Sequence, residues 1–278
     1  MSSEKIGPDE TAADRDARQL RSVRTYLTTV VGVEDVHASL RRITFATGDL
    51  RDFRPLGPDT FLYLLLPPPG QQTLTVGRSF TWQAYARMPE ADRPVGAYYT
   101  LRSWRPETSE LDLLFALHDP AGHATTWARR AEAGDRVALW GPRATFDPPP
   151  GTDWFLLVAD DTGLPAVGAI LETLPPHVPV TVVAEVACRE ERHPLPTRSA
   201  TQVIWLHRDG APAGTIASRV ADVLGGLRQP EGDGYVWAGA ERDTVKAVRR
   251  HAGEIGVPTR RTSLVAYWRR EPDEAADG

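Results

Sequence analysis

Residues 154–174 read WFLLVADDTGLPAVGAILETL. This stretch begins with six apolar residues, crosses a short polar turn at Asp160 and Asp161, and continues as a mostly apolar segment from Pro165 to Leu174. A strand without polar alternation is typical of a parallel sheet covered on both faces, and proline suits the first turn of a helix. The stretch therefore predicts one strand–helix unit of an α/β domain.

The same alternation continues to about residue 270. Further strands are predicted at residues 178–187, 202–206, 235–237 and 264–267, and further helices at residues 216–227 and 241–255. In such a domain a nucleotide binds at the carboxyl ends of the parallel strands. The glycine-rich fingerprint of the common dinucleotide fold is absent from the sequence.

The N-terminal half has a different pattern. Short predicted strands at residues 41–45, 61–66, 98–104, 111–117 and 137–140 have the spacing of an antiparallel barrel, interrupted by one helix that begins near Ala124. The run Pro148–Gly151 is typical of a linker. We therefore expect a tail (1–21), a barrel domain (22–147), an α/β domain (152–270) and an acidic tail (271–278).

The composition excludes several classes of protein. The 278 residues carry a net charge of -5, and the 32 basic residues are spread among 37 acids, which disfavours nucleic acid as a partner. The apolar runs are too short to cross a membrane, and the N-terminus lacks a secretory h-region, so we expect a cytoplasmic protein without a membrane partner. With one cysteine, redox chemistry would need a bound cofactor.

Residues Tyr98–Arg102, YYTLR, form the first segment that could carry chemistry. Strand alternation places Tyr98, Thr100 and Arg102 on one face, with Tyr99 and Leu101 on the other. A flat aromatic ligand can stack on such a strand, with Thr100 donating to a ring nitrogen and Arg102 reaching an anion. On this segment alone, an ordinary Tyr- and Thr-rich strand is the simpler interpretation.

Residues His118–Trp127, HDPAGHATTW, join a strand to a helix. Gly122 and Ala124 let a ligand approach the backbone, Thr125 and Thr126 supply hydroxyls, and a helix N-terminus favours a diphosphate. A capped helix start with a satisfied histidine explains the segment equally well. In a third segment, Asp161, Thr162 and Pro165 follow the first parallel strand, where a nicotinamide dinucleotide would bind.

In this order the segments resemble the siderophore-interacting protein family, flavin-dependent ferric-siderophore reductases of the ferredoxin-reductase superfamily. The resemblance spans about residues 22–270. It includes LRRITF (40–45), YTLR (99–102), HDPAGHATTW (118–127), DTGLPA (161–166), WLHR (205–208) and the closing YWRR (267–270). One departure is Ala97, at a position where the family usually has an arginine two residues before the tyrosine.

The resemblance implies a two-domain β plus α/β protein: a six-stranded antiparallel flavin-binding barrel, then a parallel-sheet domain resembling a nicotinamide-binding domain. It implies FAD as cofactor, NADPH or NADH as electron donor with ferredoxin as another candidate, and a ferric siderophore as substrate. The implied flavin-contacting and phosphate-contacting residues are Tyr99, Thr100, Arg102, His118, Gly122, Ala124, Thr125, Thr126 and Trp127. The implied contacts of the nicotinamide cofactor are Asp161, Thr162 and Pro165.

Basic residues near the cleft between the domains, Arg260, Arg261, Arg269 and Arg270, could hold an anionic chelate, or they could form a solvated strand edge. No nucleophile or metal-ligand set is found, and a flavin reductase needs none. Two other functions stay open: a biosynthetic enzyme on the same scaffold that catalyses a cyclisation or other non-redox step, and a siderophore-binding module without turnover.

Overall fold

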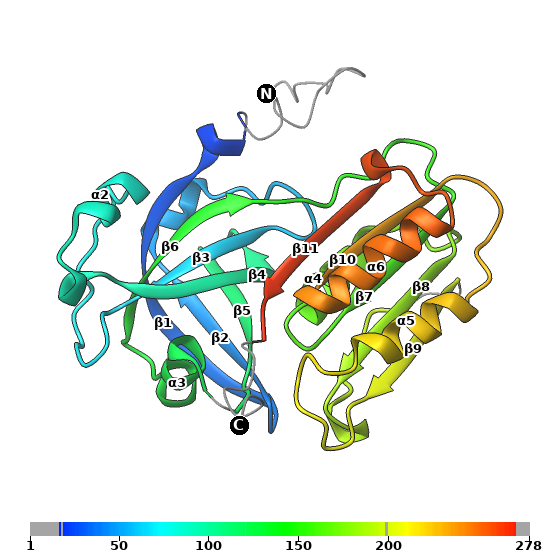
Figure 1. Ribbon diagram of the computed structural model, residues 1–278. Coiled ribbons are helices and arrows are strands. Elements are labelled where there is room, and N and C mark those ends of the chain that lie inside the picture. Colours follow the sequence, from blue (N-terminus) through cyan, green and yellow to red (C-terminus); the bar gives the residue numbers. More distant parts are fainter. Residues whose placement is uncertain (1–16, 18, 120, 198–199, 271–278) are drawn as a thin grey trace.

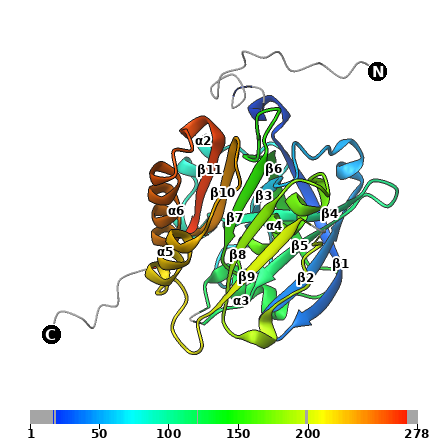
Figure 2. The same cartoon turned by 90° about the vertical axis from the view of Figure 1, so that its right-hand side faces the viewer.

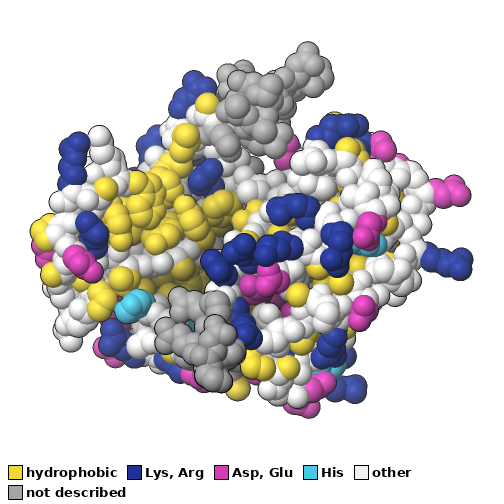
Figure 3. All heavy atoms as spheres, viewed as in Figure 1, with side chains coloured by type: hydrophobic (Ala, Val, Ile, Leu, Met, Phe, Trp, Pro, Cys, Tyr) yellow, Lys and Arg dark blue, Asp and Glu magenta, His cyan; other side chains and the backbone are white. Residues whose placement is uncertain are grey.

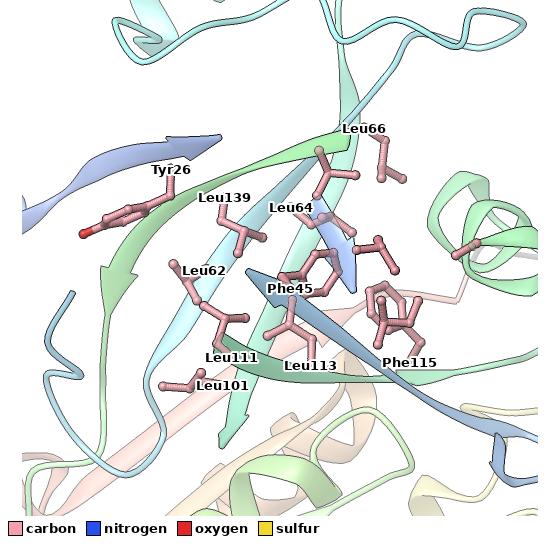
Figure 4. Close-up of a cluster of buried hydrophobic side chains, with 14 of the residues drawn as sticks. Tyr26, Phe45, Leu62, Leu64, Leu66, Leu101, Leu111, Leu113, Phe115 and Leu139 are labelled. Carbon is pink, nitrogen blue, oxygen red and sulfur yellow. The ribbon is translucent and has the colours of Figure 1, made fainter. Parts of the chain in front are cut away.

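The computed structural model describes residues 17, 19–119, 121–197 and 200–270. Its N-terminal part is a closed six-stranded barrel with the strand order β1-β2-β5-β4-β3-β6 (Figure 1). Its elements are β1 (Arg24–His37), β2 (Leu40–Ala46), β3 (Phe61–Leu66), β4 (Val95–Arg105), β5 (Glu110–Ala116), β6 (Arg136–Arg143), α2 (Trp82–Arg87) and α3 (His123–Arg130). Figure 4 shows leucine and phenylalanine side chains from these strands meeting inside the barrel.

Strand β1 is the barrel strand that the sequence pattern did not reveal. Its second half carries charged residues at positions where a buried strand would be apolar, because that half is solvated and pairs with a basic stretch of β2. Glu34 lies opposite Arg42, and Asp35 lies opposite Arg41. Cross-strand ion pairs at 2.7 Å (Arg42–Glu34) and 2.6 Å (Arg41–Asp35) thus replace apolar alternation as the signal of pairing.

The C-terminal part is a five-stranded parallel sheet with the order β11-β10-β7-β8-β9. Its elements are β7 (Trp154–Ala159), β8 (Val180–Val186), β9 (Thr201–His207), β10 (Gly234–Glu241), β11 (Thr262–Trp268), α4 (Leu164–Thr173), α5 (Ala217–Gly226) and α6 (Arg242–Glu254). Helices α5 and α6 cover one face of the sheet, whereas α4 lies between the other face and the barrel (Figures 1 and 2). The predicted architecture is confirmed.

The two domains are joined through a buried carboxylate. Asp59, just before β3, is fully buried and accepts hydrogen bonds from the Thr145 backbone N–H and hydroxyl (the latter at 2.6 Å) and from the Phe146 N–H at 2.9 Å. Burial raises the pKa of Asp59. Phe146 then packs on Phe155 and Tyr235 of the α/β domain, so one side chain anchors the segment that leaves the barrel.

The N-terminal segment contacts the barrel before β1 begins. Gln19, which the sequence places in the tail, is buried, and its side-chain amide hydrogen-bonds to the backbone of Ala144 at 2.9 and 3.0 Å. Among the described residues, no helix has the length and apolar character needed to span a membrane.

Candidate functional site

Strand β4 separates from β5 over its first half. The ladder between the two strands starts with Leu101 opposite Leu113 and ends with Arg105 opposite Glu110. Residues 95–100 pair with β3 alone among the described strands. Backbone N–H and C=O groups on this edge of β4 therefore face an opening, and a ligand entering it can satisfy them. A flat ring whose edge carries both hydrogen-bond donors and acceptors is suited to that position.

One face of β4 leads through this opening. Val95, Ala97 and Tyr99 lie opposite inward-facing leucines of β3 and so share the face turned toward the barrel interior. The Tyr99 ring lies 4.2 Å, centroid to centroid, from that of Phe115, and burial raises the pKa of its phenol. The tyrosine that the sequence singled out thus stands at the mouth of the barrel.

The same face continues into a cavity of about 930 Å³ beside the N-terminus of α3. Val95 lines this cavity together with His123, Thr126 and Arg130 of the helix, and the loop of residues 67–74 closes its other side. A volume of this size is at the upper end of those that hold cofactors. The unpaired N–H groups at the start of a helix favour an anionic group there.

Not every residue of the predicted phosphate segment reaches the cavity. The Thr125 hydroxyl is buried and lies 3.1 Å from Nε2 of His118. Trp127 is also buried and stacks on Phe45 of the barrel core, with the ring centroids 6.3 Å apart, although part of it lines the cavity beside Thr126. Thr126 is therefore the predicted hydroxyl that faces the cavity. Gly122 caps the helix through its backbone, since its carbonyl accepts from the Thr126 N–H at 2.8 Å.

Asp119 does not disturb this helix N-terminus. Its side chain is largely exposed and forms an ion pair with Arg129 at 2.9 Å. The pair offsets the negative charge that the sequence places close to the predicted phosphates. Ala124, next to the cap, packs against the barrel core and leaves the backbone approachable.

These features fit FAD. The open edge of β4 beside Tyr99 suits the ring, the start of α3 suits the diphosphate, and the cavity has room for the adenosine. The position between ring and cavity is Ala97, which carries no charge. A basic contact to the diphosphate at that point is missing, and Arg130 and Arg136 are the basic residues that line the cavity.

Thr100 and Arg102 do not follow the prediction that their side chains contact the flavin. Thr100 is buried on the opposite face of β4, and its hydroxyl lies near the Tyr267 phenol of β11. The Arg102 guanidinium forms an ion pair with Glu172 of α4, at 2.7 and 3.3 Å. The reason is strand alternation: the face opposite Tyr99 is the one that meets the α/β domain.

At the carboxyl edge of the parallel sheet, Asp160 holds the strand ends together. Its Oδ1 accepts from the N–H and hydroxyl of Thr162 (2.9 and 2.5 Å), and its Oδ2 accepts from the Glu241 N–H and the Trp268 indole, each at 2.8 Å. Asp161 and Thr162 are partly exposed there, whereas Pro165 is buried inside the start of α4. Pro165 is thus less accessible to a nucleotide than Asp161 and Thr162, because α4 lies between the sheet and the barrel, and its contact with a nucleotide stays a prediction.

A charged triad lies beside this edge. Arg208, at the end of β9, bonds to Asp161 at 2.8 Å and to Glu185 of β8 at 3.3 Å. Burial raises the pKa of Asp161 to about 6 and that of Glu185 to about 7, against the opposing effect of Arg208. The second Glu185 oxygen, Oε2, has no hydrogen-bond partner. Burial therefore favours the protonated forms of these two carboxyls more than is usual for acidic side chains.

The four arginines predicted to hold a chelate do not form one group. Arg260 and Arg261 precede β11, and Arg261 is buried in an ion pair with Asp233 at 2.6 Å. Arg269 and Arg270 follow β11, at the other end of a seven-residue strand, and line a cavity of about 310 Å³ beside α6. A strand of that length separates the two pairs of arginines by about 20 Å. At most the second pair, Arg269 and Arg270, can therefore contact a ligand that also contacts the barrel.

Comparisons with known proteins match this architecture. Residues 29–146 match the siderophore-interacting FAD-binding domain, and residues 152–271 match the siderophore-interacting protein domain. This chain belongs to the siderophore-interacting protein family. A siderophore utilization protein from T. fusca is 31% identical, with a TM-score of 0.79 over 90% of this chain and 95% of that one. Siderophore-interacting protein SipS from Aeromonas hydrophila is 28% identical, with a TM-score of 0.76 over 90% and 94%.

Named relatives of this siderophore-interacting protein include two reductases. The ferric vibriobactin reductase ViuB of Vibrio cholerae is 24% identical over 87% of this chain and 88% of its own length. The NADPH-dependent ferric-chelate reductase of Escherichia coli is 28% identical over 86% and 91%. The cofactor of this siderophore-interacting protein is FAD, and its fold is that of the ferredoxin reductases.

Glu185 and the loop of residues 67–74 were missed from the sequence. Glu185 is the one acidic residue inside the apolar predicted strand at 178–187, and a charge in such a strand is a signal of a buried polar site. The loop begins with three prolines and a glycine, Pro67–Gly70, which predict a turn and say nothing about a ligand. Its role depends on its position across the cavity from α3, which no local pattern encodes.

Proposed function

We propose that this siderophore-interacting protein reduces iron(III) held in a siderophore to iron(II), with electrons that pass through FAD from a nicotinamide cofactor. The observation that carries the proposal is the continuous path along Tyr99, Ala97 and Val95, which leads from the open edge of β4 into the cavity at α3. The names of the two reductase relatives support the choice of substrate.

Bound FAD supplies the redox chemistry, since a flavin accepts two electrons and can pass them on singly. The protein positions the cofactor. The free N–H and C=O groups of β4 orient the ring, Tyr99 keeps water from one side of it, and the start of α3 compensates the charge of the diphosphate. Iron(II) binds hard oxygen ligands less tightly than iron(III) does, so reduction releases the metal.

We further propose that the electron donor binds at the carboxyl edge of the parallel sheet, beside Asp161 and Thr162. NADPH and NADH remain the two candidates. The additional phosphate of NADPH would lie near Asp161, Glu185 and Arg208. We therefore expect the net charge of these three side chains to determine whether NADPH or NADH binds more tightly.

The test is an absorbance titration. The purified protein should be yellow or should bind added FAD. Addition of NADPH or NADH should then bleach the flavin absorbance bands. A ferric siderophore should restore these bands while an iron(II) indicator reports the reduced metal. Thr126→Trp should fill the cavity entrance and abolish FAD binding without changing the far-ultraviolet circular dichroism. A colourless protein that ignores FAD, or a flavin that no donor bleaches, would refute the redox function and favour the non-redox scaffold enzyme.

A further inference from the structure

One arginine of the barrel belongs to a row of otherwise apolar side chains. Arg41, Ile43 and Phe45 are alternate residues of β2 and so share one face of the strand. Ile43 and Phe45 are fully buried in the barrel core, so the Arg41 side chain also starts from the inward face. Figure 3 shows Lys and Arg side chains spread over the molecular surface, whereas the Arg41 side chain is only 18% exposed. A cation that gives up this much water needs specific partners.

The main partner of Arg41 is the C-terminus of α3, the helix at this end of the barrel (Figure 1). Its Nη1 donates to the backbone carbonyls of Ala128 at 2.9 Å and of Arg129 at 2.8 Å. The last carbonyls of a helix have no partner within the helix and form the negative end of its dipole, so a guanidinium there stabilises the helix in two ways. The Arg41 Nε donates to Asp35 of β1 at 2.6 Å, which fixes the orientation of the guanidinium.

The end of α3 is in turn connected to its beginning. Arg129 donates to the His118 carbonyl at 3.3 Å and pairs with Asp119 at 2.9 Å, so the last turn of the helix contacts the segment that precedes the first turn. The His118 ring lies 3.1 Å from the Thr125 hydroxyl of the first turn. A displacement of the helix end that Arg41 contacts would therefore also displace the end where the FAD diphosphate is expected.

The neighbouring Arg42 is a matched comparison for Arg41. It also belongs to β2 and also pairs with an acid of β1, since its Nη1 lies 2.7 Å from Glu34. Because successive residues of a strand point to opposite faces, the Arg42 side chain lies on the other side of β2 from Arg41. The two arginines thus share strand, charge and type of ion pair, and they differ in the contact with α3.

We propose that Arg41 is a positioning residue for the cofactor, which holds α3 in the orientation in which the start of the helix receives the FAD diphosphate. Without this contact FAD itself would have to order the helix, and its affinity would fall by the cost of that ordering. A flavin that lacks the diphosphate does not use the helix and does not depend on Arg41. The inference rests on the proposed placement of the diphosphate at α3, and it is independent of the reduction of iron.

Fluorescence titrations of the flavin-free protein with FAD and with riboflavin, which has the same ring and no diphosphate, test the proposal. Arg41→Gln should bind FAD about tenfold more weakly than the wild type, because two hydrogen bonds from a charged donor are lost, and its affinity for riboflavin should be unchanged. Arg41→Lys keeps the charge at the helix end without the planar fork and should recover part of the FAD affinity. Arg42→Gln, the matched control, should bind both flavins as the wild type does.

Hydrogen exchange of the α3 amides is a second measurement, which does not depend on riboflavin. In the flavin-free proteins, the amides of residues 126–130 should exchange faster in Arg41→Gln than in Arg42→Gln, and added FAD should reduce this difference. Wild-type FAD affinity in Arg41→Gln, an equal loss of affinity for FAD and riboflavin, or equal exchange of the α3 amides in the two variants would overturn the proposal.

A second pair of variants covers the case in which Arg41→Gln does not fold. Asp35 is exposed and orients the Arg41 guanidinium, so Asp35→Ala should weaken FAD binding while Glu34→Ala should not, and equal FAD affinities in these two variants would overturn the proposal. Thr126→Trp distinguishes a failure of the underlying placement, because undiminished FAD binding in that variant would put the diphosphate elsewhere. Bleaching of the flavin by NADPH or NADH reports on the proposed function independently of all these results.

Discussion

Replacement of Glu185 by glutamine should change how the stability of the protein depends on pH. In the folded protein the Glu185 carboxyl keeps its proton up to about pH 7, whereas its ordinary pKa is 4.5. Between these values the folded state binds more protons than the unfolded state, so stability falls as pH rises. Each pH unit costs about 1.4 kcal/mol, and the whole interval therefore costs the wild type about 3 kcal/mol.

Glu185→Gln keeps the shape of the side chain but cannot ionise, so it escapes this loss. Urea unfolding at pH 5 and at pH 8 should show the variant gaining on the wild type by about 3 kcal/mol over that range. The exposed Glu107→Gln is the matched control and should track the wild type at both values. A difference between Glu185→Gln and wild type that stays constant from pH 5 to pH 8 would refute the assignment of a protonated carboxyl beside Arg208.

Three further substitutions test the cofactor path and the packing at the start of α4, the third of them as a control. Ala97→Arg places a guanidinium on the face of β4 that leads to the cavity. The variant should bind FAD about tenfold more tightly in a fluorescence titration, and this gain in affinity should shrink as the salt concentration rises. Unchanged affinity would mean that a cavity arginine already holds the diphosphate. Gly163→Ala should lower stability by about 3 kcal/mol, because its Cβ would lie 1.9 Å from the Gly239 carbonyl oxygen. Gly168→Ala meets nothing closer than Arg102 Nε at 3.6 Å and should unfold at the wild-type temperature or above it; equal melting points for the two alanine variants would contradict the packing.

The fold follows from the sequence wherever burial is complete. The strand Trp154–Ala159 and the helix after it were predicted nearly to the residue, because the strand is apolar throughout and the helix is apolar and buried from Leu164 to Leu171. Strand β1 escaped because half of it is held by ion pairs with β2. Periodicity detects strands that bury a face, and it cannot detect one that pairs through charge.

The segments that form the candidate site could be predicted from the sequence, but the arrangement of their side chains around the cavity could not. Strand alternation correctly separated Tyr98 and Thr100 from Tyr99, yet it could not tell which face would meet the cavity. That depends on where β4 leaves β5, which is a property of the whole barrel. Arg102 illustrates the same limit, since its partner Glu172 is seventy residues away on a helix of the other domain.

The anchoring of the linker by Asp59 makes the angle between the two domains a fixed property of the molecule. Swinging the α/β domain would pull Thr145 and Phe146 away and leave a buried carboxylate without donors, at a cost of several kcal/mol. Arg102 and Glu172 brace the same joint from the other side of β4. Within the described part of the chain, these contacts oppose a swing of the α/β domain against the barrel. Under the proposed function, chelates of different bulk would differ in how far they protrude into solvent, so selectivity would depend on the part of the ligand that touches the surface and little on its total size.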